Sequence, residues 1–141
     1  MASPNLELVR SIYAAWEHGD YRSAGWAHPE IEYVHADGPS PGNWKGLDSL
    51  AVGAREWLNA WEEYRHEAEE YRELDAERVL VLITWSGRGR TSGLDLEQMR
   101  AKGAHVFHVR AGRVTKFVVY FDRDHALADL GLAPEPGSAS R

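Results

Sequence analysis

The stretch from Gly103 to Leu132, GAHVFHVRAGRVTKFVVYFDRDHALADLGL, constrains the fold of this chain more than any other segment. It contains two runs rich in Val, Phe and Tyr, separated by the turn-forming letters RAGR, a pattern typical of an antiparallel hairpin. Because successive side chains of a strand point to opposite faces, His105 shares a face with Phe107, whereas His108 lies on the other face. One of these histidines is therefore expected to face a cavity.

The turn between the two runs sets the register of the hairpin. A two-residue turn would require a positive φ at Ala111, whereas a three-residue loop with Gly112 in the left-handed conformation and a bulge would not. We therefore predict the bulged loop, which places His105 opposite Phe117. In that register the face of His105 is completed by Phe117, Val119 and Phe121 and is strongly aromatic.

Apolar spacing predicts the elements of the N-terminal part. Ser3 followed by Pro4 begins a helix with an apolar stripe that ends before Gly19. A second short helix is expected from Asp20 to His28, because a residue before proline avoids helical backbone angles. The alternating letters IEYVH then place Ile31, Tyr33 and His35 on one face of a strand.

The middle of the chain is ambiguous. Helical spacing begins at Leu47 and continues by period alone through Leu74, and the run EEYRHEAEEYRELDAE within it is typical of a solvated or dimer-rim face. The letters RVLVLITWSGRGR predict a strand, and a short terminal helix is expected around Asp124 to Leu130. We expect one domain over residues 1–132 and a disordered tail over 133–141, which is rich in Pro, Gly and Ser.

Composition excludes several classes of function. The chain has no cysteine, a net charge of −6 and no basic cluster, which argues against thiolate chemistry and against nucleic acid as a partner. No apolar run approaches the roughly 20 residues that span a bilayer, so a soluble, cytoplasmic protein without a membrane partner is expected. His105 and His108 lie on opposite faces without a carboxylate at ligand spacing, so no metal site is expected. No cofactor motif is present either, since SGRGRTSG lacks the phosphate-loop pattern.

The order of helix, helix, strand, long helix and antiparallel strands resembles the SnoaL-like branch of the nuclear transport factor 2-like superfamily. The motifs that carry the resemblance are IYAAWEHGD, HPEIEYVHADG, RAGRV and the closing FVVYFDRDHALADLGL, and together they cover roughly residues 5–132. The resemblance implies an α+β fold, in which a curved antiparallel sheet wraps around N-terminal helices as a cone-shaped barrel with one apolar pocket. It also implies that Glu67 to Leu74 is a strand.

Within this superfamily the chain resembles the steroid isomerases. His35 matches the position of their carboxylate base, and His105 matches that of their protonated carboxylic acid, so imidazoles replace both carboxylates. Their acidic tyrosine matches Ile12, and Tyr13 reaches the same region from a different angle. The resemblance to SnoaL-like cyclases implies Asp122 as another candidate base, although strand parity places it on the face opposite Phe121, and an aspartate there is also a natural helix cap.

These residues form the predicted site. A buried histidine serves as an acid or base at neutral pH, but it can equally be a hydrogen-bonded core residue. The candidate catalytic residues are His35, His105 and Asp122, and the candidate ligand-binding residues are Tyr13, Tyr33, Trp44, Trp57, Trp61, Trp85, Phe107 and Phe121.

Two hypotheses of function follow. In the first, the protein is a cofactor-independent isomerase or cyclase that acts on a small, largely apolar, polycyclic or carbonyl-bearing molecule, with His35 or His105 moving a proton. In the second, it binds or assists with such a molecule without chemistry. A homodimer is also expected, because Val106, Val118 and Tyr120 form an apolar surface on the outward face of the sheet.

Overall fold

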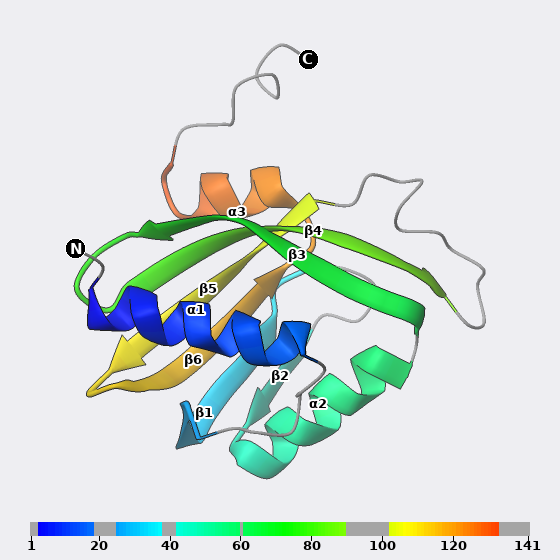
Figure 1. Cartoon of the computed structure of the whole chain (residues 1–141), viewed down its shortest axis with the longest axis horizontal. Coiled ribbons are helices and arrows are strands. Elements are labelled where there is room, and N and C mark those ends of the chain that lie inside the picture. Colours follow the sequence, from blue (N-terminus) through cyan, green and yellow to red (C-terminus); the bar gives the residue numbers. More distant parts are fainter. Residues whose placement is uncertain (1–2, 19–24, 38–41, 60, 90–101, 133–141) are drawn as a thin grey trace.

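The computed structural model describes residues 3–18, 25–37, 42–59, 61–89 and 102–132, without the side chains of residues 54, 56–58, 61–65 and 87–89 (Figure 1). Within these residues the chain forms three helices and one six-stranded sheet. The elements are α1 (Pro4–Glu17), β1 (Ala27–His35), β2 (Gly42–Lys45), α2 (Leu47–Asn59), β3 (Trp61–Glu73), β4 (Arg78–Gly89), β5 (Lys102–Arg110), β6 (Arg113–Tyr120) and α3 (Arg123–Asp129).

The sheet has the strand order β2-β1-β6-β5-β4-β3 and is curved and unclosed, with α1 and α2 on one side and α3 on the other (Figure 1). The α+β architecture expected from the sequence is confirmed. The sheet is mixed rather than wholly antiparallel, because β1 pairs with β6 in the parallel direction. The ends β2 and β3 do not pair with each other, so the sheet does not form a complete barrel.

Helix α1 begins and packs as its sequence predicts. The hydroxyl group of Ser3 accepts a hydrogen bond of 3.1 Å from the backbone N–H of Leu6, and Pro4 occupies the first helical turn. The apolar stripe of the helix buries Val9, Ile12 and Tyr13 against the sheet. Tyr13 therefore belongs to the interior of the protein.

The helical period from Leu47 to Leu74 does not describe one helix. Helix α2 ends at Asn59, and β3 runs from Trp61 to Glu73, so the strand implied by the family resemblance exists and begins earlier. Strand β3 changes register against β4 between Glu62 and Arg65 and again between Ala68 and Glu70. Such irregularities insert residues into a strand and interrupt its alternation, which explains why the apolar spacing imitated a helix.

The predicted second helix falls largely on residues that lie outside the described part of the chain. Its last two residues, Ala27 and His28, belong to β1 instead. In β1 the prediction from alternation is confirmed, because Ile31, Tyr33 and His35 are all buried on one face.

The predicted three-residue loop between β5 and β6 is wrong. Arg110 pairs with Arg113 across a two-residue turn, and Ala111 and Gly112 both have positive φ, at 52° and 78°. The bulge lies farther along the hairpin, at Thr115, so that His105 pairs with Val119 and not with Phe117. Beyond the bulge the register differs from the predicted one by two residues, so Phe117 and Val119 keep their predicted face. On the turn side of the bulge it differs by one residue, and Val114 lies on the inner face with Val109.

The outward face of the sheet is covered by the chain itself. Val106, Val118 and Tyr120 are buried in a cluster that includes Ala126 and Leu127 of α3. The exposed apolar surface from which a homodimer was predicted is therefore absent at these residues, because the terminal helix packs there.

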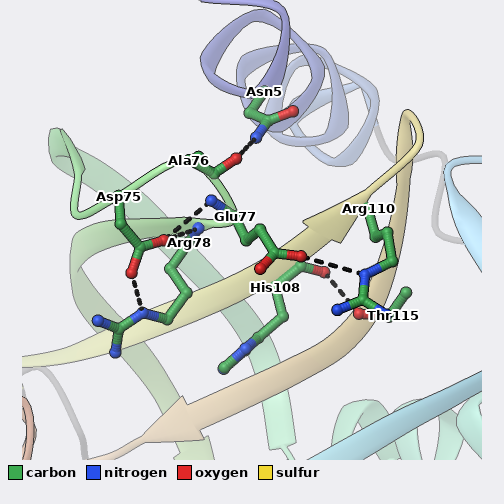
Figure 2. A network of polar contacts seen from close by, with 8 residues as sticks. All are labelled: Asn5, Asp75, Ala76, Glu77, Arg78, His108, Arg110 and Thr115. Carbon is green, nitrogen blue, oxygen red and sulfur yellow. Dashed lines mark hydrogen bonds and ion pairs between the residues drawn. The ribbon is translucent and has the colours of Figure 1, made fainter.

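A polar network ties the β3–β4 turn to α1 and to the end of β5 (Figure 2). Asp75 accepts a 2.9 Å hydrogen bond from the backbone N–H of Glu77, and Asn5 of α1 donates through its side chain to the carbonyl oxygen of Ala76 at 2.8 Å. Arg110 at the end of β5 forms a 3.1 Å ion pair with Glu77. Polar contacts thus hold the β3–β4 turn against α1 and β5 at this end of the sheet.

Arg123 is the buried charge of the outward face. Its guanidinium donates to the carbonyl oxygens of Gly103 at 3.2 Å and Ile83 at 2.6 Å, and it forms a 2.5 Å ion pair with the half-exposed carboxylate of Glu69. One side chain thereby joins α3 to β3, β4 and β5. None of the helices in the described residues is long and apolar enough to cross a membrane.

We expect Arg123→Met to lower the free energy of unfolding by about 2–4 kcal/mol, because it leaves buried carbonyl oxygens without their donor. Glu69→Gln is the matched control and should cost less than about 1 kcal/mol, since that end of the ion pair is exposed to solvent. Urea denaturation measures both values. Equal losses in the two variants would contradict this account of Arg123.

Candidate functional site

The side of the sheet that faces α1 carries two buried histidines. His35 at the end of β1 and His105 in β5 are 4 % and 3 % exposed. Both belong to the inward faces of their strands, as alternation predicted, whereas His108 on the other face of β5 is half-buried. Apart from Arg123, these two are the buried polar or charged residues of the described part of the chain.

His35 forms a pair with Tyr33, two residues before it on the same strand. The His35 Nε2 atom lies 2.7 Å from the Tyr33 hydroxyl oxygen, and the two rings meet edge to face at 4.9 Å. Burial raises the pKa of Tyr33, so its hydroxyl group stays protonated. The rings of Trp44 and Phe121, both half-buried, lie 5.0 and 5.3 Å from that of His35.

His105 forms the corresponding pair with a tyrosine from α1. Its Nδ1 atom is hydrogen-bonded to the hydroxyl group of Tyr13, and the rings of Phe117 and Trp85 lie 4.9 and 5.3 Å away. The pKa of His105 is lowered well below its ordinary value, first by burial and then by repulsion from a protonated His66 or His35. His105 is therefore neutral at physiological pH.

The two histidine–tyrosine pairs share one aromatic layer. Phe117 stacks on Tyr33 at 5.4 Å and also touches His105. Phe121 stacks on Trp85 at 5.1 Å, and these two rings contact His35 and His105 respectively. Four strands and one helix thus bring both imidazoles into a continuous aromatic environment.

His66 in β3 is a member of this cluster that the sequence analysis assigned to a solvated face. It pairs with Trp85 in the sheet, and its ring lies 5.6 Å from that of His105 and 5.4 Å from that of Trp16. Burial lowers the pKa of His66 to about 4. If the run EEYRHEAEEYRELDAE is read as a strand, alternation places His66 on the face opposite Glu67.

The remaining candidates lie in different places. Asp122 is exposed and caps α3 by accepting hydrogen bonds from the backbone N–H groups of Asp124 at 3.0 Å and His125 at 3.3 Å, so the structure does not bring it to the histidines. Trp57 and Trp61 belong to α2 and β3, but their side chains lie outside the described residues. In the described part of the chain, no group of three His, Cys, Asp or Glu residues is arranged to hold a metal ion.

Gly103 makes room for the aromatic layer. A Cβ atom at this position of β5 would lie 2.4 Å from Nε1 of Trp85 and 2.3 Å from the carbonyl oxygen of Tyr120. Only a residue without a side chain allows the indole ring to lie so close to the backbone. Gly103 thereby leaves the space in which Trp85 lies beside His105.

The fold agrees with the result of comparing the sequence with known families. Residues 9–117 match the model of the SnoaL-like domain, so the chain is a member of that family. No protein of curated function matches the sequence significantly.

Solved structures share the fold over most of the chain. A nuclear transport factor 2-like protein of unknown function from Burkholderia pseudomallei is 26 % identical, with a TM-score of 0.74 over 90 % of this chain and 97 % of that one. TerC, crystallised with polyporic acid, is 23 % identical, with a TM-score of 0.71 over 91 % and 98 %. A protein from Sinorhizobium meliloti, provisionally described as a polyketide cyclase, is 17 % identical, with a TM-score of 0.62 over 80 % and 93 %.

The lowered pKa of His66 predicts a pH dependence of stability. The unfolded chain takes up a proton on His66 below about pH 6.5, whereas the folded chain does so only near pH 4. The free energy of unfolding should therefore fall as the pH is lowered through this window, and His66→Phe should make the fall smaller. His18→Gln, at an exposed histidine, is the control and should follow the wild type in urea titrations at each pH. Parallel curves for the wild type and His66→Phe would contradict the prediction.

Proposed function

We propose that this protein binds a small, largely apolar, carbonyl-bearing molecule against the aromatic layer on the inner side of the sheet and catalyses a proton transfer of the isomerase or cyclase type. The observation that carries this proposal is the pair of buried imidazoles, each hydrogen-bonded to a tyrosine, within one continuous aromatic environment. Aromatic walls with a few polar groups are typical of sites for small molecules.

The two histidines differ in the chemistry that each can perform. His105 stays neutral because it is buried, and when Tyr13 donates to its Nδ1 atom, its proton resides on Nε2. That N–H group can donate to the carbonyl oxygen of a ligand. His105 is therefore assigned as the neutral donor that polarises the carbonyl.

His35 is assigned as the proton acceptor. When its Nε2–H donates to the hydroxyl oxygen of Tyr33, the Nδ1 atom carries the lone pair that accepts a proton. The proton comes from the carbon next to the carbonyl. The electrons of that C–H bond form the carbon–carbon double bond of an enolate, and the carbonyl π electrons move to the oxygen that His105 contacts.

The solved relatives are consistent with this class of ligand. TerC was crystallised with polyporic acid, and another neighbour is provisionally described as a polyketide cyclase. The ligand and the activity in these descriptions are those of the two related proteins. They make polyporic acid a reasonable first probe for binding by this chain.

A second candidate function is binding without catalysis. It is favoured by the placement of Asp122, which caps α3, and by the tyrosine partners that already satisfy one nitrogen of His35 and one of His105. In that case the histidines orient a ligand by hydrogen bonds and transfer no proton. The two functions differ in what the loss of an imidazole does to turnover and to affinity.

Exchange of ketone α-protons with D2O, followed by NMR on a panel that includes 1-tetralone, tests the catalytic function. We expect His35→Ala and His105→Ala each to lower the enzymatic exchange rate by roughly 100-fold or more, the usual scale for loss of an acid–base group. His108→Gln is the matched control, because it removes a histidine from the opposite face of the same strand and should leave the rate unchanged.

Binding of polyporic acid, measured in parallel by tryptophan fluorescence, separates the two functions. Loss of exchange with affinity retained in the His35→Ala and His105→Ala variants supports catalysis. If the wild type binds polyporic acid but exchanges no ketone proton, the catalytic function is contradicted and binding without catalysis is supported. A wild-type protein that neither binds nor exchanges any probe would overturn both.

A further inference from the structure

Asp37, two residues after His35, contacts two segments at the other end of the chain. Its Oδ1 atom accepts a 2.5 Å hydrogen bond from the backbone N–H of Phe121, and its Oδ2 atom lies 2.7 Å from Nδ1 of His125 in α3. The neighbouring backbone N–H of Ala36 also donates to the carbonyl oxygen of Val119 at 2.9 Å. One carboxylate therefore joins the end of β1 to the residue that follows β6 and to α3.

Phe121 connects these contacts to the candidate site. Its backbone is held by Asp37, while its ring lies edge to face with His35 at 5.3 Å and stacks on Trp85 at 5.1 Å. The ring is half-buried, in contrast to the fully buried Phe107. A displacement of the backbone at Phe121 would thus change the ring contacts of both His35 and Trp85.

We propose that Asp37 is a positioning residue that holds Phe121 against His35 and Trp85, and that protonation of His125 strengthens the contact of Asp37 with α3. The conformational part of this inference stands on the geometry alone. The further inference that the position of Phe121 affects ligand affinity rests on the proposed function of the same site.

The surroundings of His125 determine the direction of the pH effect. The charged and titratable groups that face it are Asp37 after β1, Asp122 at the N-cap of α3, Asp129 at the end of α3, and Tyr120 at the end of β6. The hydrogen bond with Asp37 is the largest cause of a raised pKa at His125. The stabilising charge pair is therefore complete below about pH 6.5 and is lost as the pH rises through the raised pKa.

His66 and His105, whose rings contact that of Trp85, do not titrate between pH 6 and pH 8.5. The pKa of His66 is about 4, and that of His105 is lowered well below its ordinary value by burial. A response of Trp85 between pH 6 and pH 8.5 that disappears in His125→Phe therefore comes from His125 and not from His35, whose ring also contacts Phe121. This separation makes NMR of the ligand-free protein a sharp test.

The test follows the backbone amide proton of Phe121 and the indole N–H of Trp85 from pH 6 to pH 8.5. In the wild type both signals should shift with the midpoint of the His125 ring. His125→Phe keeps a ring against Tyr120 but removes the proton, and it should abolish this shift in both signals. Asp37→Asn should also abolish it and should move the Phe121 amide signal upfield at every pH, because the carboxylate acceptor is gone.

Asp124→Asn is the matched control, since it neutralises an exposed carboxylate in the first turn of the same helix, and it should titrate like the wild type. Unaltered titration of both signals in His125→Phe would overturn the inference, as would a Phe121 amide that does not respond to Asp37→Asn. If polyporic acid and the ketones fail to bind at any pH while the coupling is present, the proposed function falls and the positioning role of Asp37 stands.

Discussion

The alternation of side chains along β5 and β6 is the constraint on which the rest of the structure depends. It sends Phe107, Phe117 and His105 to one side of the sheet and Val106, Val118 and Tyr120 to the other. Each side then requires its own cover, which α1 and α3 supply (Figure 1). The same rule separates the two sides in composition, because the side that faces α3 is closed by packing against that helix, whereas the side that faces α1 holds the buried imidazoles.

Placing imidazoles in an aromatic layer has an electrostatic consequence. Burial favours the neutral ring, and His66 and His105 both follow this rule. His125 follows the opposite rule, since it lies at the surface beside Asp37. His66 and His105 are thus kept uncharged in the interior, whereas His125 can be charged at the surface, and Phe121 contacts both the interior and Asp37.

Sequence patterns predicted what depends on local periodicity. The inward positions of His35 and His105 were predicted because alternation over a short strand is a property of the residues themselves. His66 was missed because irregular pairing in β3 disturbs that alternation, and pairing is decided by the neighbouring strand. The positive φ of Ala111 was missed for a related reason, since the twist of the finished hairpin favours a turn that alanine alone would avoid. Contacts between distant segments, such as that of Asp37 with His125, leave no periodic trace in the sequence.

The parallel pairing of β1 with β6 has a consequence for how the site forms. His35 lies opposite Val119, so the strand that carries it gains this neighbour only after almost all of the described chain is available. The β3–β4 and β5–β6 hairpins, in contrast, pair residues that are close in sequence and can form early. During synthesis on the ribosome the edge of β1 that pairs with β6 therefore stays open until the last strand is made. The histidine site is consequently among the last parts of the molecule to assemble, because β6 is the strand that joins β1 to the rest of the sheet.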